Sequence, residues 1–111
     1  MKDKCASPLP STYGGLRELQ KEFLVYQRAV FPVREPRFFA LELCGEVGEL
    51  ANLEKKEWKG IASSDANYAD EAADVLIAVL NYANERGIDL ARAVSEKMVE
   101  IDRRRIESLE R

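Results

Sequence analysis

Two pairs of carboxylates give this sequence its most distinctive chemistry. Glu46 and Glu49 form one pair, and Glu71 and Asp74 form the other, and the two members of each pair are three positions apart. In a helix this spacing points both side chains of a pair in the same direction. If the two helices pack together, four carboxylates meet. Because unpaired charges so close together repel one another, the cluster predicts a site for a divalent metal ion.

The residue types available in the chain narrow the choice of metal. The sequence contains no histidine, which is the commonest metal ligand and the commonest general base. All-oxygen ligands favour Mg²⁺, with Mn²⁺ as the alternative, whereas a carboxylate-bridged di-iron bundle normally needs histidine beside its glutamates. Because Mg²⁺ prefers to share its ligand sphere with substrate phosphates, the cluster predicts an enzyme that acts on phosphate esters or anhydrides.

Four helices are expected to position these acids. Apolar residues recur at spacings of three and four over about 16–31, 36–59, 66–86 and 90–109, which predicts amphipathic helices. In the second of them, Phe39 and Leu50 share a face with Glu46 and Glu49, although a surface helix would place its acids on the opposite side. Glu42 falls on that face too, and we expect it to have at most an outer role beside the cluster.

The ends of these helices carry recognisable signals. Gly60 is expected to end the second helix in a left-handed conformation, and Gly87 is expected to end the third. Ser64 or Asp65 is expected to cap the third helix, and Asp89 the fourth.

The predicted fold is all-α, an antiparallel bundle of about four helices in one domain over residues 15–111, preceded by a flexible arm over residues 1–14. Residues 75–80 are apolar all round, which is typical of the centre of a bundle or of a subunit interface. Since one subunit of this size offers limited burial, we predict that dimerisation completes the core, as a homodimer or a homotetramer.

Composition disfavours several classes of protein. A formal charge of −3 argues against a nucleic-acid-binding protein, and no apolar stretch approaches the length of a membrane span. Residues 1–10 do not resemble a signal peptide. A disulfide between Cys5 and Cys44 is not expected, because the first lies in the arm and the second in a helix core. A cytoplasmic location fits this cysteine usage.

Three segments together resemble the MazG-like nucleotide pyrophosphohydrolases of the all-α NTP pyrophosphatase superfamily. They are Gly-Glu-Val-Gly-Glu-Leu at 45–50, Asp-Glu-Ala-Ala-Asp-Val-Leu at 70–76, and Gly-Ile-Asp-Leu at 87–90. A single Glu-x-x-Glu is common in helices, so the resemblance depends on the three segments occurring together in this order. It extends over about residues 38–105.

The resemblance implies an activity and a role for each acid. Glu46, Glu49, Glu71 and Asp74 would bind Mg²⁺, and Glu49, with Glu46, would serve catalysis by orienting a water molecule or taking its proton. The implied reaction cleaves a nucleoside triphosphate between the α and β phosphates, in a nucleotide-pool house-cleaning role. The alternatives are a related activity on dUTP, dCTP or phosphoribosyl-ATP, or a non-catalytic helical dimer that binds a nucleotide or a protein partner.

Five further residues are candidates for binding the substrate. Lys56 could meet phosphate or merely complement the helix dipole, Trp58 could stack on a base or pack within the protein, and Asn81 could bind sugar or base or be a buried structural amide. Lys97 and Arg104 resemble basic residues on the family's last helix that meet the β and γ phosphates. The base is not identified, because Ile101-Asp102 replaces an asparagine that many relatives carry.

Overall fold

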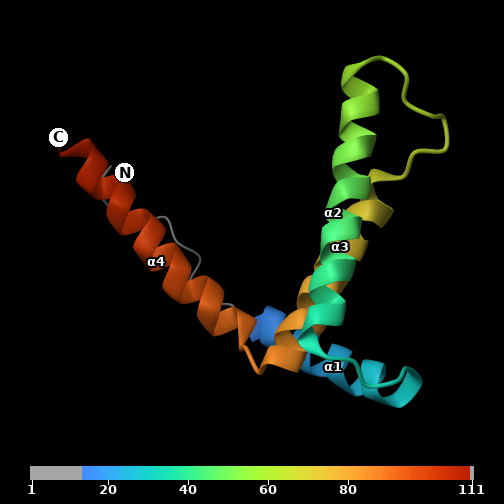
Figure 1. The fold of residues 1–111 in the computed structure, drawn as a ribbon. Coiled ribbons are helices and arrows are strands. Elements are labelled where there is room, and N and C mark those ends of the chain that lie inside the picture. The colour runs from blue at the N-terminus through green and yellow to red at the C-terminus, as the bar shows by residue number, and fades with distance from the viewer. Residues whose placement is uncertain (1–13, 111) are drawn as a thin grey trace.

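The computed structural model describes residues 14–110 as an all-helical chain. Its four helices are α1 (Gly14–Val30), α2 (Pro36–Trp58), α3 (Tyr68–Arg86) and α4 (Leu90–Leu109) (Figure 1). The predicted fold class is therefore confirmed, with helix limits close to those expected from the apolar periodicity. Residues 1–13 of the expected arm lie outside the described part of the chain, and Gly14 already belongs to α1.

The helices α2 and α3 form an antiparallel hairpin, the most extensive pairing between elements of the chain (Figure 1). Glycine ends both helices as predicted, because Gly60 and Gly87 have φ angles of 75° and 71°, in the left-handed region that other residues avoid. The Ile88 N–H donates to the Ala83 carbonyl at 2.9 Å, which completes the end of α3.

The prediction for the start of α3 was wrong by a few residues. Asn67 caps this helix, since its side-chain oxygen accepts a hydrogen bond from the Asp70 N–H at 3.0 Å. Ser63 and Asp65 instead hydrogen-bond each other within the preceding turn. The side chain of Asp65, one of the two predicted caps, is therefore not available to cap α3. Asp89 caps α4 as predicted, accepting from the Arg92 N–H at 3.3 Å.

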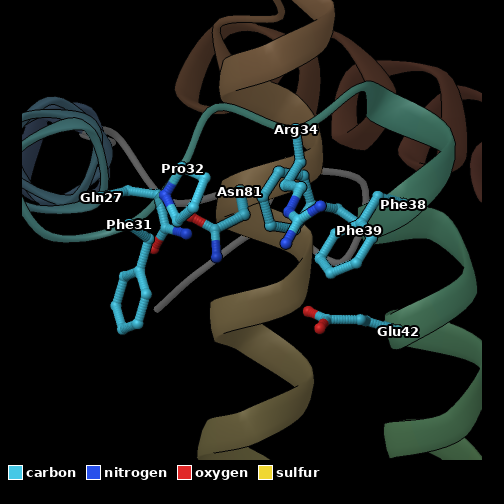
Figure 2. Close-up of a pocket in the computed structure, with 8 residues that line it drawn as sticks. All are labelled: Gln27, Phe31, Pro32, Arg34, Phe38, Phe39, Glu42 and Asn81. Atoms are coloured by element: carbon cyan, nitrogen blue, oxygen red, sulfur yellow. The ribbon is translucent and has the colours of Figure 1, made fainter.

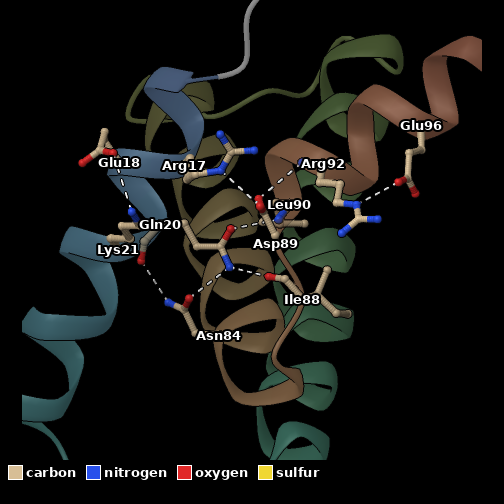
Figure 3. A network of polar contacts seen from close by, with 10 residues as sticks. All are labelled: Arg17, Glu18, Gln20, Lys21, Asn84, Ile88, Asp89, Leu90, Arg92 and Glu96. Carbon is tan, nitrogen blue, oxygen red and sulfur yellow. Dashed lines mark hydrogen bonds and ion pairs between the residues drawn. The ribbon is translucent and has the colours of Figure 1, made fainter.

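A buried glutamine joins three helices at one corner of the molecule (Figure 3). Gln20 of α1 is 8% exposed, and its Nε2 donates to Asn84 Oδ1 at 3.0 Å and to the Ile88 carbonyl at 2.6 Å. Its Oε1 accepts the Leu90 N–H at 3.0 Å, and Asn84 Nδ2 donates to the Gln20 carbonyl at 3.2 Å. This network fixes α1 against the joint between α3 and α4.

A single chain does not close a bundle, because α4 projects away from the α2–α3 hairpin (Figure 1). The radius of gyration is 17.9 Å, whereas a compact domain of this length would have about 13 Å. The apolar stretch of α3 is therefore only partly covered. Leu76 is 47% exposed and Ile77 is 39% exposed, whereas Ala78 and Leu80 are buried. No helix within residues 14–110 is both long and apolar enough to cross a membrane.

Two side chains expected inside the fold lie on its surface. Cys44 is exposed, and Trp58 is 88% exposed at the end of α2. Among residues 14–110, α2 packs extensively against α3 alone, so the described part of the chain does not cover the outer side of α2. The prediction of a core position was wrong for Cys44, and the packing alternative was wrong for Trp58 within this subunit.

Candidate metal centre

The α2–α3 hairpin brings acids from both helices together. One carboxylate oxygen from each of Glu46, Glu49 and Glu71 lies within 4.8 Å of the other two. The first pair comes from consecutive turns of α2, and the third residue from the first turn of α3 that faces them. Glu46 and Glu71 are half-buried, and Glu49 is exposed at the edge of the group.

Asp74 extends this group along α3. Asp70, Glu71 and Asp74 form a second set whose carboxylate oxygens also lie within 4.8 Å of one another, and Glu71 belongs to both sets. Asp70 was not among the predicted ligands. Its spacing of four residues from Asp74 is a signal that the sequence offered, although its exposed position at the start of α3 makes it the more peripheral acid.

The electrostatics of the group reflect crowding of like charges. Partial burial, followed by the charge of Glu49, raises the pKa of both Glu46 and Glu71 above the ordinary glutamate value of 4.5. Asp74 adds to the rise in both pKa values. Glu49 lies within hydrogen-bonding reach of both half-buried acids. Within residues 14–110, no lysine or arginine forms an ion pair with any of these four acids.

Two oxygen atoms test whether a metal ion fits this site. Glu46 Oε2 and Glu71 Oε2 are buried and have no hydrogen-bond partner among the described residues. Leaving a buried polar atom without a hydrogen-bond partner costs about 1–3 kcal/mol in general, so such atoms indicate a place where a ligand or ion binds. A hard divalent cation satisfies carboxylate oxygens without needing any other donor type, so the residues present fit Mg²⁺ or Mn²⁺.

Cavities lie on both sides of the carboxylates along the hairpin. One, of about 430 Å³, lies where the loop meets the two helices and is lined by Lys56 together with Asp70 and Glu71. The other, of about 280 Å³, lies towards α1 and is lined by Glu42 and Asn81 among others. The acids therefore lie between two cavities, one lined by a cationic side chain and the other by a buried amide.

Of the five candidate substrate-binding residues, two lie beside the carboxylates and three lie elsewhere in the subunit. Lys56 and Asn81 line the cavities beside the carboxylates, whereas Trp58 stands exposed at the end of α2. Lys97 and Arg104 lie on α4, which diverges from the hairpin, so one subunit does not bring them to the acids (Figure 1). Arg104 pairs with Glu100 at 2.9 Å on its own helix.

Comparison with known proteins identifies the class of protein that this fold and site belong to. Residues 34–106 match the MazG nucleotide pyrophosphohydrolase domain family, and the chain belongs to this family. The match includes all four of the predicted metal ligands. No solved structure matches the chain at a significant level.

A curated relative is dCTP pyrophosphatase 1 of Rattus norvegicus. The two sequences are 38% identical over 101 aligned residues, which cover 83% of this chain. They cover 57% of the relative, so the chain spans little more than half of that protein's length.

Proposed function

We propose that this chain is a Mg²⁺-dependent nucleoside triphosphate pyrophosphohydrolase. Water would form a bond to the α-phosphorus, the bond from that phosphorus to the bridging oxygen would break, and the products would be a nucleoside monophosphate and pyrophosphate. The observation that carries the proposal is the group of acids around Glu46 Oε2 and Glu71 Oε2 in a chain of the MazG family, because these two buried oxygens have no hydrogen-bond partner within residues 14–110.

Each acid has a proposed role. Glu46, Glu49, Glu71 and Asp74 would hold Mg²⁺, with Mn²⁺ as a substitute. A bound ion would supply Lewis-acid chemistry there, since it would neutralise phosphate charge and lower the pKa of water. Glu49 is the most exposed of the four, and this exposure supports a role in which it would orient the attacking water and accept its proton. Glu46 would support this carboxylate from the preceding turn.

The two cavities on either side of the acids suggest the direction in which the substrate would lie. Lys56 lies seven residues beyond Glu49 on α2, and Asn81 lies seven beyond Asp74 on α3, so each is about 10 Å along its helix from the acids. Because the helices are antiparallel, these two residues lie at opposite ends. Lys56 would meet the β and γ phosphates, and Asn81 would bind the sugar or base.

A second subunit would complete the site. The bare apolar face of α3 and the open angle of α4 support a homodimer or homotetramer, in which Lys97 and Arg104 would reach the phosphates of a neighbouring subunit. Trp58 is 88% exposed near the Lys56 end of its own site, so it would stack on a base bound by a neighbouring subunit.

The proposal extends to the preferred nucleotide, the biological role and the cellular location. The relative named for dCTP makes dCTP a first candidate, with dUTP and phosphoribosyl-ATP as alternatives from the wider superfamily. A house-cleaning role against non-canonical or excess nucleotides would suit such an activity. A cytoplasmic location suits the exposed free thiol of Cys44, because a reducing compartment preserves it.

A hydrolysis panel tests the proposal. The protein is incubated with ordinary and modified nucleoside triphosphates, with and without Mg²⁺, and the products are identified by chromatography and mass spectrometry. We expect monophosphate and pyrophosphate, formed only with the metal. Release of orthophosphate, or no turnover of any nucleotide, would overturn the proposal and leave a non-catalytic helical protein as the better description.

A matched pair of variants tests the role of Glu49. Glu49→Gln keeps the size of the side chain but removes its charge and its ability to accept a proton, so we expect turnover to fall by at least about 100-fold. Glu54→Gln, an exposed acid on the same helix that lines neither cavity, is the control. Near wild-type turnover in Glu49→Gln would contradict the assignment.

A further inference from the structure

The cavity towards α1 has the character of a pocket for a flat, polar ring (Figure 2). Its volume is about 280 Å³, close to the lower end of ligand pockets, which span about 300–1,000 Å³. Phe31 and Phe38 contribute aromatic walls, and polar side chains enter from α2, α3 and the connection between α1 and α2. Aromatic walls with a few convergent polar groups are the usual lining of a small-molecule site.

A buried amide without a full set of partners faces this cavity. Asn81 is 6% exposed, and its Oδ1 is buried without a hydrogen-bond partner among the described residues. A buried acceptor of this kind is satisfied when a ligand brings an N–H or O–H group. This observation is independent of the acids of the metal centre.

Two opposite charges complete the lining. Glu42 extends its carboxylate from α2 towards α3, and the Arg34 guanidinium lies across the Phe38 ring, 4.9 Å from its centroid (Figure 2). Neither Glu42 nor Arg34 forms an ion pair within residues 14–110. The cavity thus offers a carboxylate that accepts hydrogen bonds and a guanidinium that donates them.

This pair of charges matches one edge of certain nucleobases. Cytosine and adenine carry an amino group beside an unprotonated ring nitrogen, so their edge presents a donor next to an acceptor. Uracil presents a carbonyl oxygen where cytosine has the amino group, and that oxygen would oppose the Glu42 carboxylate. Glu42 is one helical turn, about 6 Å, from the metal ligand Glu46, which leaves the ring within reach of a phosphate at the acids.

We propose that this cavity binds the nucleobase and that Glu42 is a specificity-determining residue, selecting bases with an amino group beside a ring nitrogen. Glu42 accepts from the amino group, Arg34 donates to the ring nitrogen or the neighbouring carbonyl, and the base lies against the aromatic walls. The inference rests on the proposed function, because it assumes a nucleotide whose phosphates lie at the metal centre.

The test compares two substrates that differ at a single group of the base. The values of kcat and KM for dCTP and dUTP are measured with the wild type, with Glu42→Gln and with the control Glu54→Gln. We expect the wild type to prefer dCTP. Glu42→Gln should reduce the ratio of the two kcat/KM values by roughly 10-fold or more, the range for one charge-assisted hydrogen bond, mainly through KM. The control should keep the wild-type ratio.

Binding of the products separates the two proposals. Calorimetry with dCMP and dUMP examines base recognition without any bond cleavage, so it gives a result even if no triphosphate is hydrolysed. Tighter binding of dCMP that is weakened in Glu42→Gln supports the base pocket, whatever the turnover. Turnover with equal preference for the two bases, an unchanged ratio in Glu42→Gln, or no selective binding of dCMP would overturn it. Circular dichroism confirms that each variant is folded.

Discussion

Replacement of Gln20 by leucine tests how α4 is held to the rest of the chain. The side chain makes three hydrogen bonds, to Asn84, to the Ile88 carbonyl and from the Leu90 N–H. Each contributes about 0.5–1.5 kcal/mol, and part-buried groups left without a partner add to the loss. Leucine recovers some of this by its larger apolar surface. We therefore expect the free energy of unfolding to fall by about 2–4 kcal/mol.

Urea and thermal unfolding monitored by circular dichroism measure this change. At about 4–8 °C per kcal/mol for a small domain, the melting temperature of Gln20→Leu should fall by roughly 8–30 °C. Glu22→Leu, at an exposed position of the same helix, is the control and should change the free energy of unfolding by less than about 0.5 kcal/mol. A loss for Gln20→Leu as small as that of the control would refute the argument that this network holds the joint.

Three further predictions concern the metal centre and the hairpin. Mg²⁺ should raise the melting temperature of the wild type, because it binds only the folded arrangement of acids, and it should not raise that of Glu49→Gln to the same extent; calorimetry with a Mg²⁺ titration checks this. In the presence of a chelator, Glu71→Gln should be more stable than the wild type near neutral pH, and this advantage should shrink as the pH falls towards 4.5. The reason is that burial and then the Glu49 charge raise the pKa of Glu71 in the folded state. The stabilising contribution of Glu71 is therefore present at low pH and is lost as the pH rises through the raised pKa. Equal pH dependence of the melting temperatures of the two proteins would contradict this prediction. Gly87→Ala should destabilise the protein by about 1 kcal/mol, since alanine is strained at the φ of 71°, and urea unfolding measures the difference.

Local patterns in the sequence were enough to determine the helices and the spacing of the acids. Apolar periodicity located all four helices, and Gly60 and Gly87 marked their ends because only glycine adopts positive φ without strain. The cap of α3 was missed, since Asn67, Ser64 and Asp65 are all suitable cap residues. The competing hydrogen bond between Ser63 and Asp65 decided among them.

Only the tertiary structure decided what each helix face meets. Spacing placed Glu46 and Glu49 on one face of α2. The packing of α2 against α3 brought Glu71 within 4.8 Å of them and left two buried oxygens with no hydrogen-bond partner among the described residues. The same packing left Trp58 and Cys44 exposed, because no helix within residues 14–110 covers the outer side of the hairpin.

The cavity beside Asn81 is another feature that the sequence alone could not predict. Its walls come from α1, α2, α3 and the segment between the first two, so no single periodicity in the sequence could predict that Glu42 and Arg34 line one space. The direction of α4 likewise follows from the Gln20 network, which joins residues 64 to 70 positions apart. Sequence determined which side chains each helix presents, because helical geometry is local, and the tertiary structure decided their neighbours, because those contacts depend on packing between distant segments.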